Sequence, residues 1–183
     1  MSKLYVDGCS FTYGEGLDRK YSLANLLSAD IDMSHPGKSN SNIIYDTYRH
    51  INDADIFVVG FTFSNRTTLW HNEMPIGINP TTVELSRLYR HPAGEILEEK
   101  YKDFHKIFYT LFNDNYQHTI SDFFIDGLVE ILRQQQKKII VFSMEKRNCI
   151  NDVFYPDIND QLPDGHYNET GMKKLSEAIK KRL

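Results

Sequence analysis

Residues suited to nucleophilic catalysis stand near the two ends of this chain. Ser10 lies in the segment 7–14, which follows a short apolar run, residues 4–6, typical of a buried strand. Asp164 and His166 supply a carboxylate and an imidazole within one loop near the other end. A serine becomes nucleophilic when a histidine takes its proton, and a carboxylate orients that histidine. The residue types therefore predict Ser10 as nucleophile, His166 as general base and Asp164 as orienting acid; the alternative is that Ser10 only caps a helix.

The elements that must position these side chains alternate between strands and helices. Such alternation predicts a single domain over residues 1–183, a three-layer α/β/α sandwich of the flavodoxin-like type with a mostly parallel sheet of four or five strands. An irregular insertion at about residues 66–94 is expected either to bind substrate or to pack down as a structural patch. Apolar runs or alternation predict strands at 4–6, 29–33, 54–61 and 138–142, and helical periodicity predicts helices at 22–27, 43–48, 95–111, 120–132 and 172–183.

Composition narrows the class of protein. The net charge of −4 argues against a nucleic-acid binder with a broad cationic face. No apolar run approaches the roughly 20 residues of a membrane span, and no secretory segment opens the chain, so a cytoplasmic protein is expected. The 7 histidines are scattered without the paired spacing of zinc ligands, so neither a metal nor another cofactor is expected. The oligomeric state is left open.

The segments around Ser10, Gly37 and His166 resemble, in this chain order, the sequence blocks of the SGNH or GDSL-like hydrolases. The resemblance covers nearly the whole chain, with Gly8-Cys9-Ser10 in place of the usual Gly-Asp-Ser. It implies an SGNH-hydrolase fold in which Ser10 is the nucleophile, and the backbone N–H groups of Ser10 and Gly37 stabilise the oxyanion. It also implies a small-molecule or carbohydrate ester as substrate, for instance an O-acetylated carbohydrate.

The third block of that family departs from its usual pattern here. No asparagine stands two residues after Gly60, so the candidates for its oxyanion donor are Thr62, Ser64 and a shifted Asn65, while Asn40 offers a further donor in the loop after Gly37. Asp164 precedes His166 by two residues instead of three. Two alternatives follow: a catalytically weak or inactive binding protein of the same fold, and a phosphoryl-transfer hydrolase that uses Asp7 as nucleophile.

Overall fold

The centre of the molecule is a five-stranded parallel sheet. The computed structural model describes residues 2–71, 74–78, 114–147 and 153–183. Every strand pair in this sheet is parallel, and the strand order is β2-β1-β3-β6-β7. This order confirms the predicted flavodoxin-like class. The strands are β1 (Leu4–Gly8), β2 (Ile31–Asp32), β3 (Ile56–Phe61), β6 (Lys138–Ser143) and β7 (Val153–Phe154).

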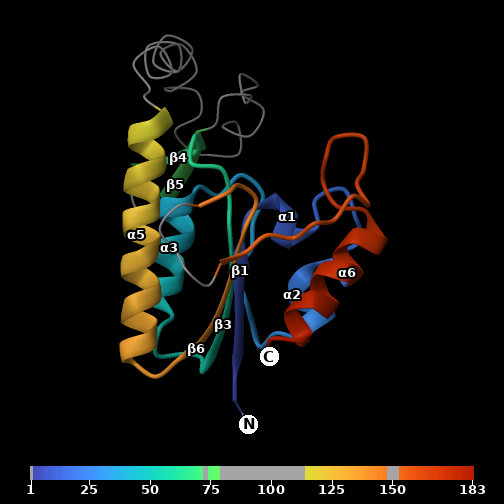
Figure 1. Cartoon of the computed structure of the whole chain (residues 1–183), viewed down its shortest axis with the longest axis horizontal. Helices are drawn as coiled ribbons and strands as arrows, with labels where there is room; N and C mark the ends of the chain where they lie inside the picture. The colour runs from blue at the N-terminus through green and yellow to red at the C-terminus, as the bar shows by residue number, and fades with distance from the viewer. Residues whose placement is uncertain (1, 72–73, 79–113, 148–152) are drawn as a thin grey trace.

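Helices cover both faces of the sheet, which gives the three layers that the sequence predicts. In Figure 1 the helices α3 (Asn40–Arg49) and α5 (Asp114–Gln134) lie on one side of the strands. The helices α2 (Leu23–Leu27) and α6 (Glu169–Lys180) lie on the other side. A single 3-10 turn, η1 (Arg19–Tyr21), precedes α2. Ser22 caps α2, as the sequence suggests, because its hydroxyl accepts a hydrogen bond from the backbone N–H of Asn25.

Two buried clusters hold these layers together. Side chains of a strand alternate between faces, so neighbouring residues of β3 enter different clusters. Val58 packs with α2 and α6 in a cluster that includes Leu175 of α6. Phe57 and Val59 pack with α3 and α5 in a cluster that includes Ile125 of α5. β3 is therefore covered on both faces, as its near-continuous apolar run predicts.

Some boundaries differ from the sequence prediction. α3 begins at Asn40 instead of residue 43, and α5 begins at Asp114 instead of residue 120. The described part of the segment predicted to be irregular forms an antiparallel pair, β4 (Thr67–His71) and β5 (Met74–Ile78). The rest of that segment and the helix predicted at 95–111 lie outside the described residues. None of the helices in the described part combines the length and apolar character that a membrane crossing requires.

The order of the strands indicates that a ligand site should lie at the carboxyl edge of the sheet. The strand order reverses between β1 and β3, because the chain first adds β2 on one side of β1 and then β3 on the other. Ligands of open α/β sheets bind at such a reversal, outside the carboxyl ends of the strands. The short helix α1 (Ser10–Tyr13) lies at this edge, directly after β1 (Figure 1).

Candidate active site

Ser10 is the first residue of α1. Cys9 precedes it as the N-cap in an extended conformation, and Gly14 ends the helix with a φ of 75°. That left-handed conformation favours glycine. Ser10 lies inside the helix, so it is not the N-cap residue that the alternative interpretation required. The first N–H groups of a helix have no partner within it, so the N–H of Ser10 is not used by α1.

Two glycines allow α1 to rest directly on the strand ends. Gly8 of β1 and Gly60 of β3 are paired in the parallel ladder. A Cβ added to Gly8 would lie 2.0 Å from Oγ1 of Thr12, and one added to Gly60 would lie 2.3 Å from the ring of Phe142. Neither position therefore accepts a side chain without displacement of its neighbours. Oγ1 of Thr12 is buried here without a hydrogen-bond partner.

His166 lies in a tight turn stabilised by its own backbone. The N–H of Leu162 donates to the carbonyl of His166 at 2.6 Å, and Gly165 adopts a φ of 88° between Asp164 and His166. The backbone N–H of His166 donates to Oδ1 of Asp164 at 3.1 Å, and this hydrogen bond lowers the pKa of the carboxyl. Oδ2 of Asp164 lies 3.1 Å from Nδ1 of His166, but the ring nitrogen is not aligned with it for a hydrogen bond. The carboxylate is thus close to the imidazole and only partly orients it.

The ring of His166 packs against the helix that carries Ser10. Its centroid lies 4.8 Å from that of Phe11, the residue after Ser10. Nε2 of His166 lies 3.6 Å from Oε2 of Glu15, and neither ring nitrogen makes a hydrogen bond. The side chain of His166 is 18% exposed. The fold therefore brings the predicted base to α1, where Glu15, which sequence reasoning missed, is the carboxylate nearest to Nε2 among the described contacts.

Asp7 is a buried anchor and not an exposed nucleophile. It is 0% exposed, and Oδ1 accepts hydrogen bonds from Nζ of Lys38 at 2.5 Å and from the N–H of Gly8 at 2.7 Å. Burial raises the pKa of Asp7 to about 7, although the Lys38 ammonium acts in the opposite direction. Lys38 also lies 2.7 Å from Oδ2 of Asp46 on α3. Oδ2 of Asp7 also accepts a hydrogen bond from the hydroxyl of Tyr5 at 3.0 Å. The phosphoryl-transfer alternative, which requires a carboxylate oxygen of Asp7 that can attack, has no support in this geometry.

The ion pair between Asp7 and Lys38 holds the loop that contains Gly37. Gly37 adopts a φ of 84°, which its neighbours could not adopt without strain. Before it, the N–H of His35 donates to the carbonyl of Gly8 at 3.1 Å, which extends the contact of this loop with β1. Gly37 therefore lies in a loop fixed beside the end of β1, as the sequence predicts for residues after neighbouring parallel strands.

Asn40 and Thr62 form a buried clamp between α3 and the end of β3. Oδ1 of Asn40 accepts a hydrogen bond from the N–H of Thr62 at 2.8 Å, and Nδ2 donates to the carbonyl of Thr62 at 3.0 Å. Nδ2 also donates to Oγ of Ser121 on α5 at 2.9 Å. The amide of Asn40 is thus occupied within the protein, whereas Oγ1 of Thr62 is buried without a partner.

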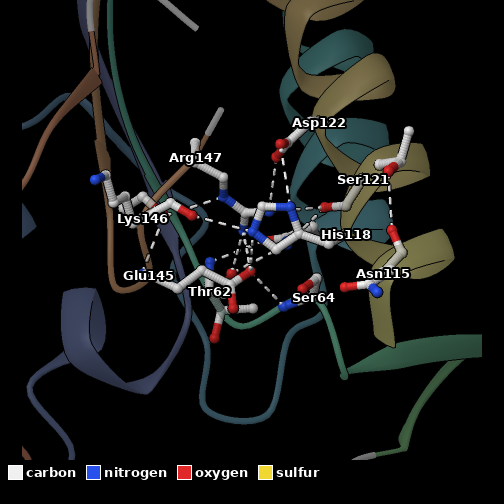
Figure 2. A network of polar contacts seen from close by, with 12 residues as sticks. Thr62, Ser64, Asn115, His118, Ser121, Asp122, Glu145, Lys146 and Arg147 are labelled. Carbon is white, nitrogen blue, oxygen red and sulfur yellow. Dashed lines mark hydrogen bonds and ion pairs between the residues drawn. The ribbon is translucent and has the colours of Figure 1, made fainter. Parts of the chain in front are cut away.

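Arg147 extends this clamp into a network of charged side chains (Figure 2). Its guanidinium is fully buried and donates to the carbonyl of Thr62 at 2.5 Å and to Oδ1 of Asp122 at 3.1 Å. Glu145 lies 3.0 Å from the same guanidinium and accepts a hydrogen bond from the N–H of Ser64 at 2.8 Å. His118 lies 3.2 Å from Asp122. The network fixes the residues after β3 to β6 and α5.

The remaining predicted donors lie farther along the segment after β3. Ser64 lines a cavity between α3 and α5, and its N–H is occupied by Glu145. Asn65 is half-buried and also has interaction partners. Within the described ranges no group of three or more histidine, cysteine or acidic side chains is arranged to hold a metal ion. Among the candidates for the third block, Thr62 alone has a buried hydroxyl with no hydrogen-bond partner.

Comparison with solved structures identifies the fold as SGNH/GDSL-like. TesA matches with a TM-score of 0.57 and 10% identity, over 99% of this chain and 97% of that one. The psychrotrophic esterase EstA from Pseudoalteromonas sp. matches with a TM-score of 0.53 and 10% identity, over 99% of this chain and 98% of that one. No family model matches the sequence, and no curated protein matches it. The similarity is therefore one of fold, and it confirms the fold that the sequence resemblance implies.

Proposed function

We propose that this protein is a serine hydrolase that cleaves small esters. The observation that carries the proposal is the contact between His166 and α1, in which the imidazole packs 4.8 Å from the ring of Phe11, next to Ser10. Acyl transfer from a serine needs a base that can take its proton, and ligands of open α/β sheets bind at the strand-order reversal where α1 lies. The SGNH/GDSL-like fold, shared with a structure described as an esterase, supports the same assignment.

In the proposed reaction, Oγ of Ser10 attacks the ester carbonyl while Nε2 of His166 takes the hydroxyl proton. The same proton then passes to the alcohol that leaves, and water hydrolyses the acyl group from Ser10 with His166 again as base. For this step Nε2 of His166 must turn from Glu15, which lies 3.6 Å away, toward Ser10. Asp164 stabilises the imidazolium from the Nδ1 side, at 3.1 Å.

The oxyanion of the tetrahedral intermediate needs preorganised donors. We assign the backbone N–H groups of Ser10 and Gly37 and the hydroxyl of Thr62 to this role. Thr62 directly follows β3, two residues after Gly60, over which Thr12 of α1 packs. Its buried, unpartnered hydroxyl supports the choice of Thr62 over Ser64 and Asn65.

A short acyl group is the proposed substrate feature. Ser10 is only 2% exposed, and Phe11 beside it packs against both His166 and Tyr167. Because Ser10 is almost fully covered, we propose a small acyl group, such as the acetyl of an ester on a carbohydrate, in preference to a bulky acyl chain. The alternative function, an inactive binding protein of this fold, is favoured by the absence of hydrogen bonds to both ring nitrogens of His166.

A covalent probe separates these functions. A fluorophosphonate should label Ser10, and p-nitrophenyl acetate should be hydrolysed in the presence of a chelator. Ser10→Ala should abolish both reactions. Cys9→Ala is the matched control, since Cys9 is the buried neighbour of Ser10 and has no role in the proposed reaction. Labelling of Cys9, or no labelling and no turnover in the folded wild-type protein, would refute the serine hydrolase proposal.

A further inference from the structure

A cavity of about 410 Å³ lies between α3 and α5, on the side of the sheet opposite α2 and α6. Its size is within the range of sites for small organic ligands. Most of the surface of its wall is apolar, and its apolar and aromatic residues include Ile44 and Tyr48 of α3 and Phe124 of α5. The rest of the lining is polar, and much of it lies near the carboxyl edge of the sheet. It consists of Asn40, Ser41, Ser64, Arg66, Thr67, Gln117 and Ser121.

Arg66 gives this cavity a charge preference. It is the one charged side chain among the described residues that line the cavity. Nη1 of Arg66 is buried without a hydrogen-bond partner. A guanidinium nitrogen that has lost water and gained no acceptor is unfavourable, so a turn of the half-buried Arg66 side chain toward a carboxylate or phosphate oxygen in the cavity would remove that cost. Among the described residues that line the cavity there is no aspartate or glutamate, which favours an anion over a cation there.

The apolar end of the cavity continues into a second one of about 180 Å³. The two share Ile44, Tyr48 and Phe124 in their walls. Tyr48 is 55% exposed and Phe124 is 54% exposed, so apolar surface is left uncovered along this groove. Gly127 of α5 lines the second cavity, and a Cβ placed there would meet no atom within 4 Å. The groove therefore has room for an extended apolar chain.

We propose that this groove is a binding site for an anionic amphiphile, with the anion on Arg66 and the apolar chain between α3 and α5. The charge of Arg66 and the apolar walls are complementary to these two parts of one ligand. The proposal does not depend on the hydrolase function, because no residue assigned to catalysis lines either cavity. Carboxylate and phosphate head groups share the required chemistry.

Titration calorimetry with amphiphiles of equal tail length tests the head group, at concentrations below micelle formation. The wild-type chain should bind decanoate or decyl phosphate saturably, and decyltrimethylammonium at least tenfold more weakly. Arg66→Gln should weaken binding of the anion at least tenfold, the effect of one lost charge-assisted hydrogen bond. Arg133→Gln, which removes the same charge from the exposed surface of α5, is the matched control and should leave the affinity unchanged.

A second variant tests the tail. Gly127→Leu adds a side chain whose Cβ meets no atom within 4 Å, so it should occupy part of the second cavity without loss of helix propensity. It should weaken decanoate binding and leave hexanoate binding unchanged, whereas Gly127→Ala should preserve both. Ser10→Ala should leave binding intact, which separates this site from the proposed hydrolase. Equal binding of anionic and cationic amphiphiles, no saturable binding, or no response to Arg66→Gln would overturn the proposal.

Discussion

Replacement of Asn40 by alanine tests the clamp that holds the end of β3. The side chain of Asn40 makes three hydrogen bonds, two with the backbone of Thr62 and one with Ser121. After the change, the carbonyl of Thr62 and the hydroxyl of Ser121 each keep a bond to Arg147, at 2.5 Å and 3.3 Å. The N–H of Thr62 loses its acceptor in a buried position. The unpaired N–H of Thr62 should therefore account for most of the loss of stability.

A buried donor left without a partner costs about 1–3 kcal/mol, and each of the other two bonds contributes at most about 1 kcal/mol. Alanine is well tolerated at the start of a helix interior, so α3 itself should not lose stability. We expect the free energy of unfolding to fall by about 2–4 kcal/mol. For a domain of this size that corresponds to a decrease in Tm of about 5–15 °C.

Urea denaturation followed by circular dichroism measures the change, provided that the dependence on urea has the same slope in both proteins. Asn42→Ala is the matched control. Asn42 is also buried on α3, but its side chain makes one hydrogen bond, at 2.9 Å to Asp46, which keeps its contact with Lys38. This control should lose about 1 kcal/mol or less. If Asn40→Ala costs no more than Asn42→Ala, the reasoning about the Thr62 N–H is wrong.

Two further predictions concern charged groups near Ser10. His166→Ala should lower turnover of p-nitrophenyl acetate by several orders of magnitude. Asp164→Ala should leave about a hundredth of the activity, because Asp164 only partly orients the ring of His166. Equal losses in the two variants would contradict this prediction. Asp7 has a pKa of about 7 when folded, above its ordinary value of 3.8, so its contribution to stability is greatest below pH 4 and is lost as the pH rises through 7. The unfolding free energy of the wild type, relative to that of Asp7→Asn, should therefore fall as the pH rises over that range, and a difference independent of pH would contradict the burial argument.

The sheet could be predicted from sequence because its central strands are buried on both faces. β3 and β6 consist of near-continuous apolar runs, and burial on two sides selects for such runs. β7 could not be predicted, since a two-residue strand carries no periodicity. The hairpin of β4 and β5 was also hidden, because Pro75 and Gly77 are typical of loops. Both residues are tolerated in this two-stranded sheet, where each strand has a free edge.

The sequence places the start of α3 three residues too late, at residue 43 instead of Asn40, because the first residues of the helix are polar. Asn40 and Asn42 are buried, although asparagine usually signals a loop or a cap. Their amides are satisfied by partners that only the folded chain brings close, Thr62 for Asn40 and Asp46 for Asn42. Local sequence pattern therefore predicts a polar loop at 37–42, whereas tertiary hydrogen bonds make its second half the first turn of a helix.

Some residues of the candidate site could be placed from local sequence pattern, and others only from tertiary contacts. The placement of Ser10, Gly37 and His166 near the end of β1 was predictable, because each stands in a recognisable turn; their roles in catalysis stay a prediction. The buried Arg147 was not, because nothing near it in the sequence indicates that it meets Asp122 and the carbonyl of Thr62. An arginine after a strand is usually solvated, and only its complete burial reveals that it holds two elements together.

Thr62 is a candidate from the sequence whose surroundings only the folded structure reveals. Its N–H is taken by Asn40, and its carbonyl is shared by Asn40 and Arg147, so both backbone groups are occupied. A residue held so firmly can present its side chain with little freedom, which is what an oxyanion donor requires. The hydroxyl is the polar group of Thr62 that remains without a partner. Under the proposed function, Thr62→Val should therefore reduce kcat. It should change stability little, because a methyl group replaces a hydroxyl that has no hydrogen bond to lose. A large loss of stability with unchanged kcat would assign Thr62 a structural role instead.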